Sequence, residues 1–229
     1  MDSMFCFQCE QTAKGKGCTK VGVCGKQPDV AVKQDELTCA LIGLARAAER
    51  KGPGKTANEL MMEGLFATLT NVNFDGSRID GLIKKVHDEK SKLGDAPDFP
   101  VSNLWNGDSD TVSLRSTLLL GIRGMSAYAW HAHVLGMEDS DVTSWFYRGM
   151  RAIGQDHTVE EWLNIIMEFG KINLKCMALL DRANTSAFGN PAPTKVTTNV
   201  EKGPFIVISG HDLEDLKQLL EQTNGKGIN

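Results

Sequence analysis

Residues 29–51 read DVAVKQDELTCALIGLARAAERK, and this stretch decides the fold class. Its apolar residues recur at the spacing of an α-helix, i, i+4, i+7 and i+11, and therefore form one stripe. The residues of this stripe are Leu37, Leu41, Leu44 and Ala48. Gly52 and Pro53 follow directly and predict the end of the helix. Such a helix is marginal alone, so we expect other helices to cover its apolar face.

More helices are predicted downstream. Thr56 and Glu59 have the spacing of a capping box, which predicts the start of a second helix, and a third is predicted to end near Gly94. Residues 95–110 read as a loop. Two further helices are predicted over about 111–135 and about 140–153. A last helix is predicted to start at a second capping box, Thr158 and Glu161, and to continue to about Arg182.

The short loops between these amphipathic helices favour antiparallel neighbours. Residues 29–190 are therefore predicted to form a helical domain of two three-helix bundles, with a seam near 95–110. The fold class expected for the chain is mainly α.

The character of the sequence changes after the helices. Residues 184–204, NTSAFGNPAPTKVTTNVEKGP, read as a connector, and FIVISG at 205–210 reads as a strand followed by a helix. A strand, a turn and a helix open an α/β unit, but one strand cannot make a sheet. Residues 191–229 are thus expected to hold a connector and the start of an incomplete, truncated α/β domain.

Upstream of the helices, residues 1–28 form a loop that contains four of the six cysteines. Cys6, Cys9, Cys18 and Cys24 lie within MFCFQCEQTAKGKGCTKVGVCGK (4–26), with the spacing C-x2-C-x8-C-x5-C. The glycines of this loop allow it to fold back on itself, and backbone N–H groups can then donate to sulfur. Lysines at 14, 16, 20 and 26 give a positive excess that suits several thiolates.

Three kinds of site can use four cysteines: disulfides, a zinc site and an iron–sulfur cluster. The N-terminus shows no secretory signal and no stretch is long and apolar enough to span a membrane, so a cytoplasmic protein with reduced thiols is expected rather than disulfides. A net charge of -4 gives no reason to expect nucleic acid as a partner. Zinc sites commonly pair two C-x2–4-C hooks, and the second hook here is longer. The spacing alone leaves zinc and an iron–sulfur cluster equally open.

The cysteine segment closely resembles the N-terminal signature of the hybrid cluster proteins, also called prismane proteins or hydroxylamine reductases. Four later segments resemble the same family in the same order, so the resemblance covers essentially the whole chain. These are GLFATLTNVNFD (64–75), AYAWHAHVLG (127–136), MALLDRANTSAFGNP (177–191) and ISGHDLEDLKQLL (208–220). The related nickel carbon monoxide dehydrogenases differ in their cysteine signature.

The resemblance implies an oxidoreductase that reduces hydroxylamine to ammonia, nitric oxide, or both. It assigns Cys6, Cys9, Cys18 and Cys24 to an electron-transfer cluster, expected to be [4Fe–4S], with [2Fe–2S] or zinc as alternatives. It also implies a second, hybrid iron–sulfur–oxygen cluster whose ligands lie in α/β domains beyond this chain. No catalytic residue is therefore expected here, and the chain alone is expected to be inactive. The implied electron donor is a ferredoxin-like or flavin-containing reductase. The alternative function is a stand-alone structural metal-binding module.

Cys39 and Cys176 lie in apolar helical stretches, away from the loop. Free cysteines in such surroundings usually behave as small hydrophobic residues. We therefore expect both to be buried in the core and to take no part in the metal site.

Overall fold

The computed structural model describes residues 4–94 and 96–228. These residues form eight α-helices and no strand, which confirms the mainly α class. They divide into two compact units with a boundary between Leu180 and Asp181, and each unit is described by itself. No helix among them combines the length and apolar character needed to cross a membrane.

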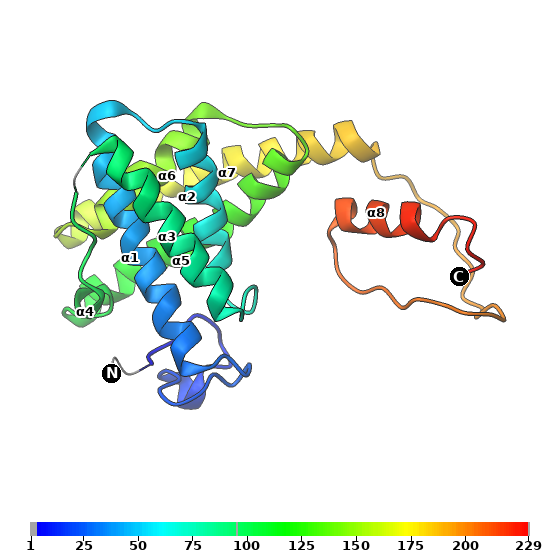
Figure 1. The fold of residues 1–229 in the computed structure, drawn as a ribbon, viewed down its shortest axis with the longest axis horizontal. Coiled ribbons are helices and arrows are strands. Elements are labelled where there is room, and N and C mark those ends of the chain that lie inside the picture. Colours follow the sequence, from blue (N-terminus) through cyan, green and yellow to red (C-terminus); the bar gives the residue numbers. More distant parts are fainter. Residues whose placement is uncertain (1–3, 95, 229) are drawn as a thin grey trace. The chain divides into compact units, whose positions relative to one another are not determined.

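The elements follow one another in the order shown in Figure 1. A short 3-10 turn, η1, precedes the helices within the cysteine loop. The bounds are η1 Ala13–Gly15, α1 Pro28–Lys51, α2 Lys55–Ala67, α3 Gly76–Leu93, α4 Val101–Leu104, α5 Ser109–Val134, α6 Ser140–Ile153, α7 Val159–Phe188 and α8 Leu213–Thr223.

Helix α1 is the centre of the first unit. It packs against α2, α3, α4 and α6, and the stretch from Leu37 to Ala45 is buried on every side. The sequence predicted a single apolar stripe on this helix. Between Leu37 and Ala45, however, its side chains are small or apolar on every side, and such a helix can be fully enclosed by others. Gly52, with a φ of 72°, ends α1 and donates its N–H to the Ala48 carbonyl at 2.8 Å.

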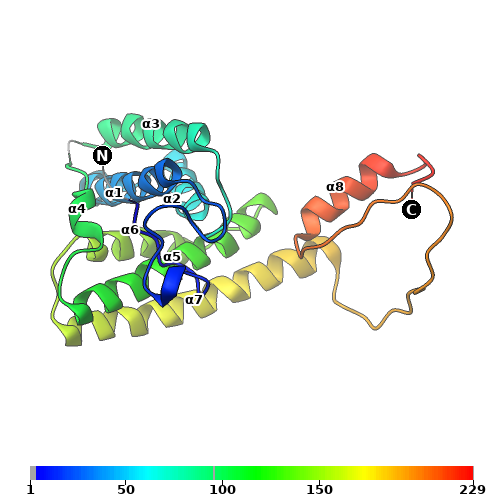
Figure 2. The ribbon, with the colours of Figure 1, turned by 90° about the horizontal axis from the view of Figure 1, so that it is seen from below.

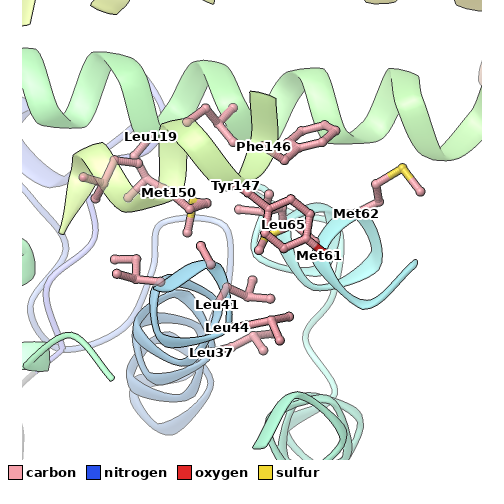
Figure 3. Packing of buried hydrophobic residues seen from close by; sticks show 14 of the residues in the cluster. Leu37, Leu41, Leu44, Met61, Met62, Leu65, Leu119, Phe146, Tyr147 and Met150 are labelled. Carbon is pink, nitrogen blue, oxygen red and sulfur yellow. The ribbon is translucent and has the colours of Figure 1, made fainter. Parts of the chain in front are cut away.

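The helices lie in layers around α1. Figure 2 shows α1 and α2 between α3 on one side and α5 and α6 on the other, in agreement with the helix contacts. Figure 3 shows side chains from α1, α2, α5 and α6 meeting in one core, among them Leu41, Met61, Leu65, Phe146 and Met150. Each such side chain contributes roughly 1.5–3 kcal/mol when fully buried.

The two predicted groups of three helices are present, as α1–α3 and α5–α7. They do not have separate cores, because a single cluster of buried residues contains members of both. The segment between them, predicted as a plain loop, includes α4 and runs along α1, where the Phe99 N–H donates to the Cys39 carbonyl at 3.2 Å. The expected seam is thus crossed by continuous packing.

The prediction of a strand at residues 205–210 is wrong for the described residues. These residues form no strand, and Phe205, Ile206, Val207 and Ile208 are exposed. The physical reason is that a strand exists only through hydrogen bonds to a neighbour, and no segment of the described residues supplies one. The helix expected after it is present as α8, capped by the Asp212 side chain, which accepts from the Asp215 N–H at 3.0 Å.

Candidate metal centre

The cysteine loop folds as a short hairpin. Cys6 and Cys18 lie opposite each other in an isolated antiparallel bridge, with N–H to carbonyl distances of 3.1 and 2.8 Å in the two directions. The chain reverses between them through η1, and the Thr12 hydroxyl donates to the Cys6 carbonyl at 3.0 Å. The hairpin therefore places two of the four cysteines side by side.

The hairpin is anchored at the N-terminal end of α1, where Figure 1 shows it in blue. Met4 and Cys18, which is 4% exposed, pack with Ala31 of α1 in a small apolar cluster. The Phe7 ring stacks edge-on against Trp105, with 5.2 Å between centroids. These contacts hold the loop on the helices although it has little apolar content of its own.

The Cys18 sulfur lies between the segments that lead to the other cysteines. Hydrogen bonds from the backbone N–H groups of Ala13 and Val23 lower the pKa of the Cys18 thiol, and the Thr12 hydroxyl and the Lys26 charge act in the same direction. The Ala13 N–H lies 3.4 Å from the sulfur. These donors stabilise the thiolate, which is the form of cysteine that binds metal.

Cys24 lies on a tight turn closed by two backbone hydrogen bonds, from Gly22 N–H to the Lys26 carbonyl and from Gly25 N–H to the Gly22 carbonyl, each 2.8 Å. A Cβ atom at Gly22 would lie 3.0 Å from the Cys24 sulfur. The absence of a side chain at Gly22 therefore leaves space beside that sulfur.

All six cysteines are free thiols. Cys6 and Cys18 are brought together, whereas Cys9 and Cys24 lie on separate turns of the same loop. Within residues 4–94 and 96–228, no group of three or more Cys, His, Asp and Glu side chains gathers closely enough to hold a single metal ion. The disulfide alternative thus finds no support in the structure.

Two buried cations lie beneath the loop. The Lys26 side chain is 1% exposed, and its Nζ donates to Oε1 of Gln34 on α1 at 2.7 Å. Arg123 of α5 is 0% exposed, and its Nη2 donates to the Thr38 hydroxyl at 2.8 Å. Each cation acts electrostatically on a cysteine of the hairpin, Lys26 on Cys18 and Arg123 on Cys6.

One partly buried carboxyl group accompanies these cations. Asp35 of α1 accepts a hydrogen bond from the Trp105 indole N–H at 3.0 Å. Burial raises the pKa of Asp35 to about 6, although this hydrogen bond and the charges of Arg123 and Lys26 oppose the rise. The floor of the site therefore consists of two cations and one carboxyl group.

Sequence reasoning missed Arg123, Asp35 and Trp105 as parts of the site, because they come from different elements. One signal was available. Arg123 is the single charged residue within LLLGIRGMSAYAW (118–130), on a helix that is otherwise apolar there. Charged residues are rarely fully buried without an opposite charge, so this position was a candidate for a functional role.

Cys39 and Cys176 are buried in the core, as predicted. Burial raises the pKa of each thiol to about 12, and the Cys176 thiol donates to the Met125 carbonyl at 3.6 Å. Both therefore remain protonated at neutral pH, unlike the thiolates that bind metal.

Comparison with known proteins gives consistent results over the whole chain. Hydroxylamine reductase of Syntrophobacter fumaroxidans is 44% identical over 261 residues, covering 99% of this chain and 48% of the relative. Hydroxylamine reductase of Thermodesulfovibrio yellowstonii is 42% identical over 259 residues, covering 98% and 48%. Hydroxylamine reductase of Methanocella arvoryzae is 40% identical over 262 residues, covering 99% and 48%. The chain thus spans about half the length of the curated relatives it matches.

The family comparison agrees with these relatives. Residues 4–229 match the Prismane/CO dehydrogenase family, a range that contains the cysteine hairpin, all the helices and the second unit. The match confirms the resemblance that was based on five sequence segments. The chain belongs to the Prismane/CO dehydrogenase family.

Proposed function

We propose that this chain is the iron–sulfur electron-transfer portion of a hydroxylamine reductase. The observation that carries the proposal is the hairpin, in which Cys6 and Cys18 lie side by side and the buried cations Arg123 and Lys26 act on them, in a chain 40–44% identical to hydroxylamine reductases. Cys6, Cys9, Cys18 and Cys24 would be the ligands.

The residues present fit an iron–sulfur cluster. Cluster ligands are thiolates, and the backbone donors to the Cys18 sulfur together with Lys26 and Arg123 offset thiolate charge. The short cysteine spacing resembles the type that carries [4Fe–4S], whereas family members with wider spacing carry [2Fe–2S], and it therefore supports [4Fe–4S]. Such a cluster, when bound, supplies one-electron transfer. A cytoplasmic location suits six free thiols.

The reaction proposed for the whole protein is the reduction of hydroxylamine. Its N–O bond breaks, two electrons and two protons are taken up, and ammonia and water are formed. The electrons would come from a ferredoxin-like or flavin-containing donor protein and pass through the portion that this chain represents. Because the chain spans about half of its relatives, we propose that the remaining half holds the hybrid cluster and that these 229 residues alone do not reduce hydroxylamine.

Anaerobic purification followed by metal analysis tests the metal site. We expect iron and acid-labile sulfide in equal amounts, and a broad visible absorption that dithionite bleaches. Replacing Cys18 by Ser should remove most of the iron and loosen residues 4–28, since metal binding and loop order are coupled. The matched control is Cys39→Ser, which should retain its iron because Cys39 lies in the core.

A colourless protein with stoichiometric zinc would overturn the proposal and favour a structural metal-binding module. Loss of iron in Cys39→Ser, with full iron in Cys18→Ser, would show that the ligands are assigned wrongly. Hydroxylamine consumption by the purified chain with reduced methyl viologen would contradict the expected inactivity.

A further inference from the structure

Arg123 is a fully buried cation whose contacts with the described residues do not account for its burial. Its Nη2 donates to the Thr38 hydroxyl, which in turn donates to the Gln34 carbonyl at 2.8 Å. Its Nε and Nη1 atoms are buried and have no hydrogen-bond partner among the described residues. One neutral hydrogen bond offsets little of the cost of removing a guanidinium from water.

Negatively charged groups near Arg123 include a cysteine of the hairpin. Burial lowers the pKa of Arg123 to about 10, so it stays charged at neutral pH, and Asp35, Cys6 and Cys39 act against this shift. The Cys39 thiol stays protonated, as described above. The remaining anionic partners are the Asp35 carboxylate and the Cys6 sulfur of the hairpin.

The charges beneath the hairpin do not balance one another within this set of residues. Arg123 and Lys26 contribute two positive charges beneath the hairpin, and Asp35 contributes at most one negative charge. The other groups that contact the two cations, Gln34 and Thr38, are neutral. Glu36 also acts on Asp35, but it is exposed to solvent. The excess positive charge is balanced when the cysteines of the hairpin are thiolates.

We propose that Arg123, together with Lys26, provides the fixed positive charge that balances the cysteine thiolates and raises the reduction potential of the cluster. Arg123 is thus a positioning residue, which acts on the cluster through Cys6 rather than as a ligand. The inference rests on the proposed iron–sulfur site. A reduced cluster carries one more negative charge than an oxidised one, so a buried cation favours the reduced state.

A redox titration of the iron-loaded chain, followed by visible absorption and electron paramagnetic resonance, tests this role. Arg123→Gln should lower the equilibrium constant for one-electron reduction at least tenfold, which is about 59 mV in potential. Arg123→Lys keeps the charge and should restore most of the potential. Asp35→Asn removes a partly buried negative charge and should shift the potential in the opposite direction.

Arg115 provides the matched control. It is a second buried arginine on α5, but its Nη1 donates to the carbonyls of Asn103 and Asn106 at 2.8 and 3.0 Å, at the end of α4. Arg115→Gln should lower the melting temperature without changing the potential. A purely structural role for Arg123 predicts the same behaviour for Arg123→Gln.

The outcomes separate this inference from the proposed function. If the wild-type chain binds no iron, the proposed function fails. If it binds iron and Arg123→Gln has an unchanged potential, this inference is wrong. If Arg123→Gln loses its iron, recovery in Arg123→Lys supports the role of charge and no recovery refutes it. If neither Arg123 variant folds, Asp35→Asn decides, and an unchanged potential there overturns the inference.

Discussion

Asp35 lies on α1, where it contacts Trp105 and shares the floor of the site with Arg123 and Lys26. Burial raises its pKa from 3.8 to about 6. In the unfolded chain the carboxyl group releases its proton at about pH 4, whereas the folded chain holds it to a higher pH. Between these values the folded state binds more protons, so the free energy of unfolding falls as the pH rises.

Asp35→Asn should remove this fall. For the metal-free chain, the stability of the wild type relative to Asp35→Asn should decrease by up to about 3 kcal/mol between about pH 4 and pH 7. Urea titrations at several pH values measure the difference. The control is Glu36→Gln, at the neighbouring exposed position, which removes the smallest of the contributions to the Asp35 pKa and should therefore keep most of the pH dependence of the wild type. An equal effect of both substitutions would show that burial of Asp35 is not the cause.

The same residues show what the sequence could reveal of the site. The cysteine spacing and the glycines of the loop are local features, so the candidate ligands could be predicted from residues 4–26 alone. Asp35, Trp105 and Arg123 are far apart in the chain and meet only after α1, α4 and α5 have packed. No periodicity or spacing encodes such a meeting, so the charged floor of the site could not be predicted.

At the level of helices, two similar sequence signals had different outcomes. The capping box at Thr158 and Glu161 is present, with the Thr158 N–H donating to Glu161 Oε2 at 2.7 Å and the Glu161 N–H donating to the Thr158 hydroxyl at 3.3 Å. The box predicted at Thr56 and Glu59 is absent, because α2 already begins at Lys55 after Gly54, without a side-chain cap. Thr56 is therefore inside the first turn.

This difference predicts unequal effects of the same substitution. Thr158→Ala should lower the free energy of unfolding by about 1 kcal/mol, since it removes the cap of α7. Thr56→Ala should leave stability unchanged or raise it by a few tenths of a kcal/mol, because alanine has the higher helix propensity. Thermal or urea unfolding of the two variants measures this. A loss of stability in Thr56→Ala equal to that in Thr158→Ala would contradict the assigned start of α2.

Helix ends elsewhere were predictable wherever a glycine terminates the helix, as at Gly52 and Gly94. The division of the helices into two separate bundles could not be predicted in the same way, because it depends on which apolar faces meet. Here the faces of α1 and α2 meet α5 and α6 in one core. Local patterns therefore specified most of the helices, while the long-range packing that joins them was not encoded in any single stretch.

At the level of the whole molecule, residues 205–208 form an exposed apolar segment in the second unit. Its four residues have high β propensity and no charge, and Val207 is 81% exposed. Helix α8 of the same unit has no buried residue. An unpaired apolar segment of this kind is a template for pairing with another chain, and such segments commonly cause aggregation.

A charge placed in this segment should therefore reduce self-association. We expect Val207→Lys to lower the light scattering of concentrated protein severalfold and to leave the iron content unchanged, because the cysteine hairpin belongs to the other unit. Val200→Lys makes the same chemical change at an exposed position of the same unit outside the apolar segment, and should have little effect. If both variants reduce scattering equally, net charge rather than strand pairing causes the association. If neither does, residues 205–208 do not mediate contact between chains.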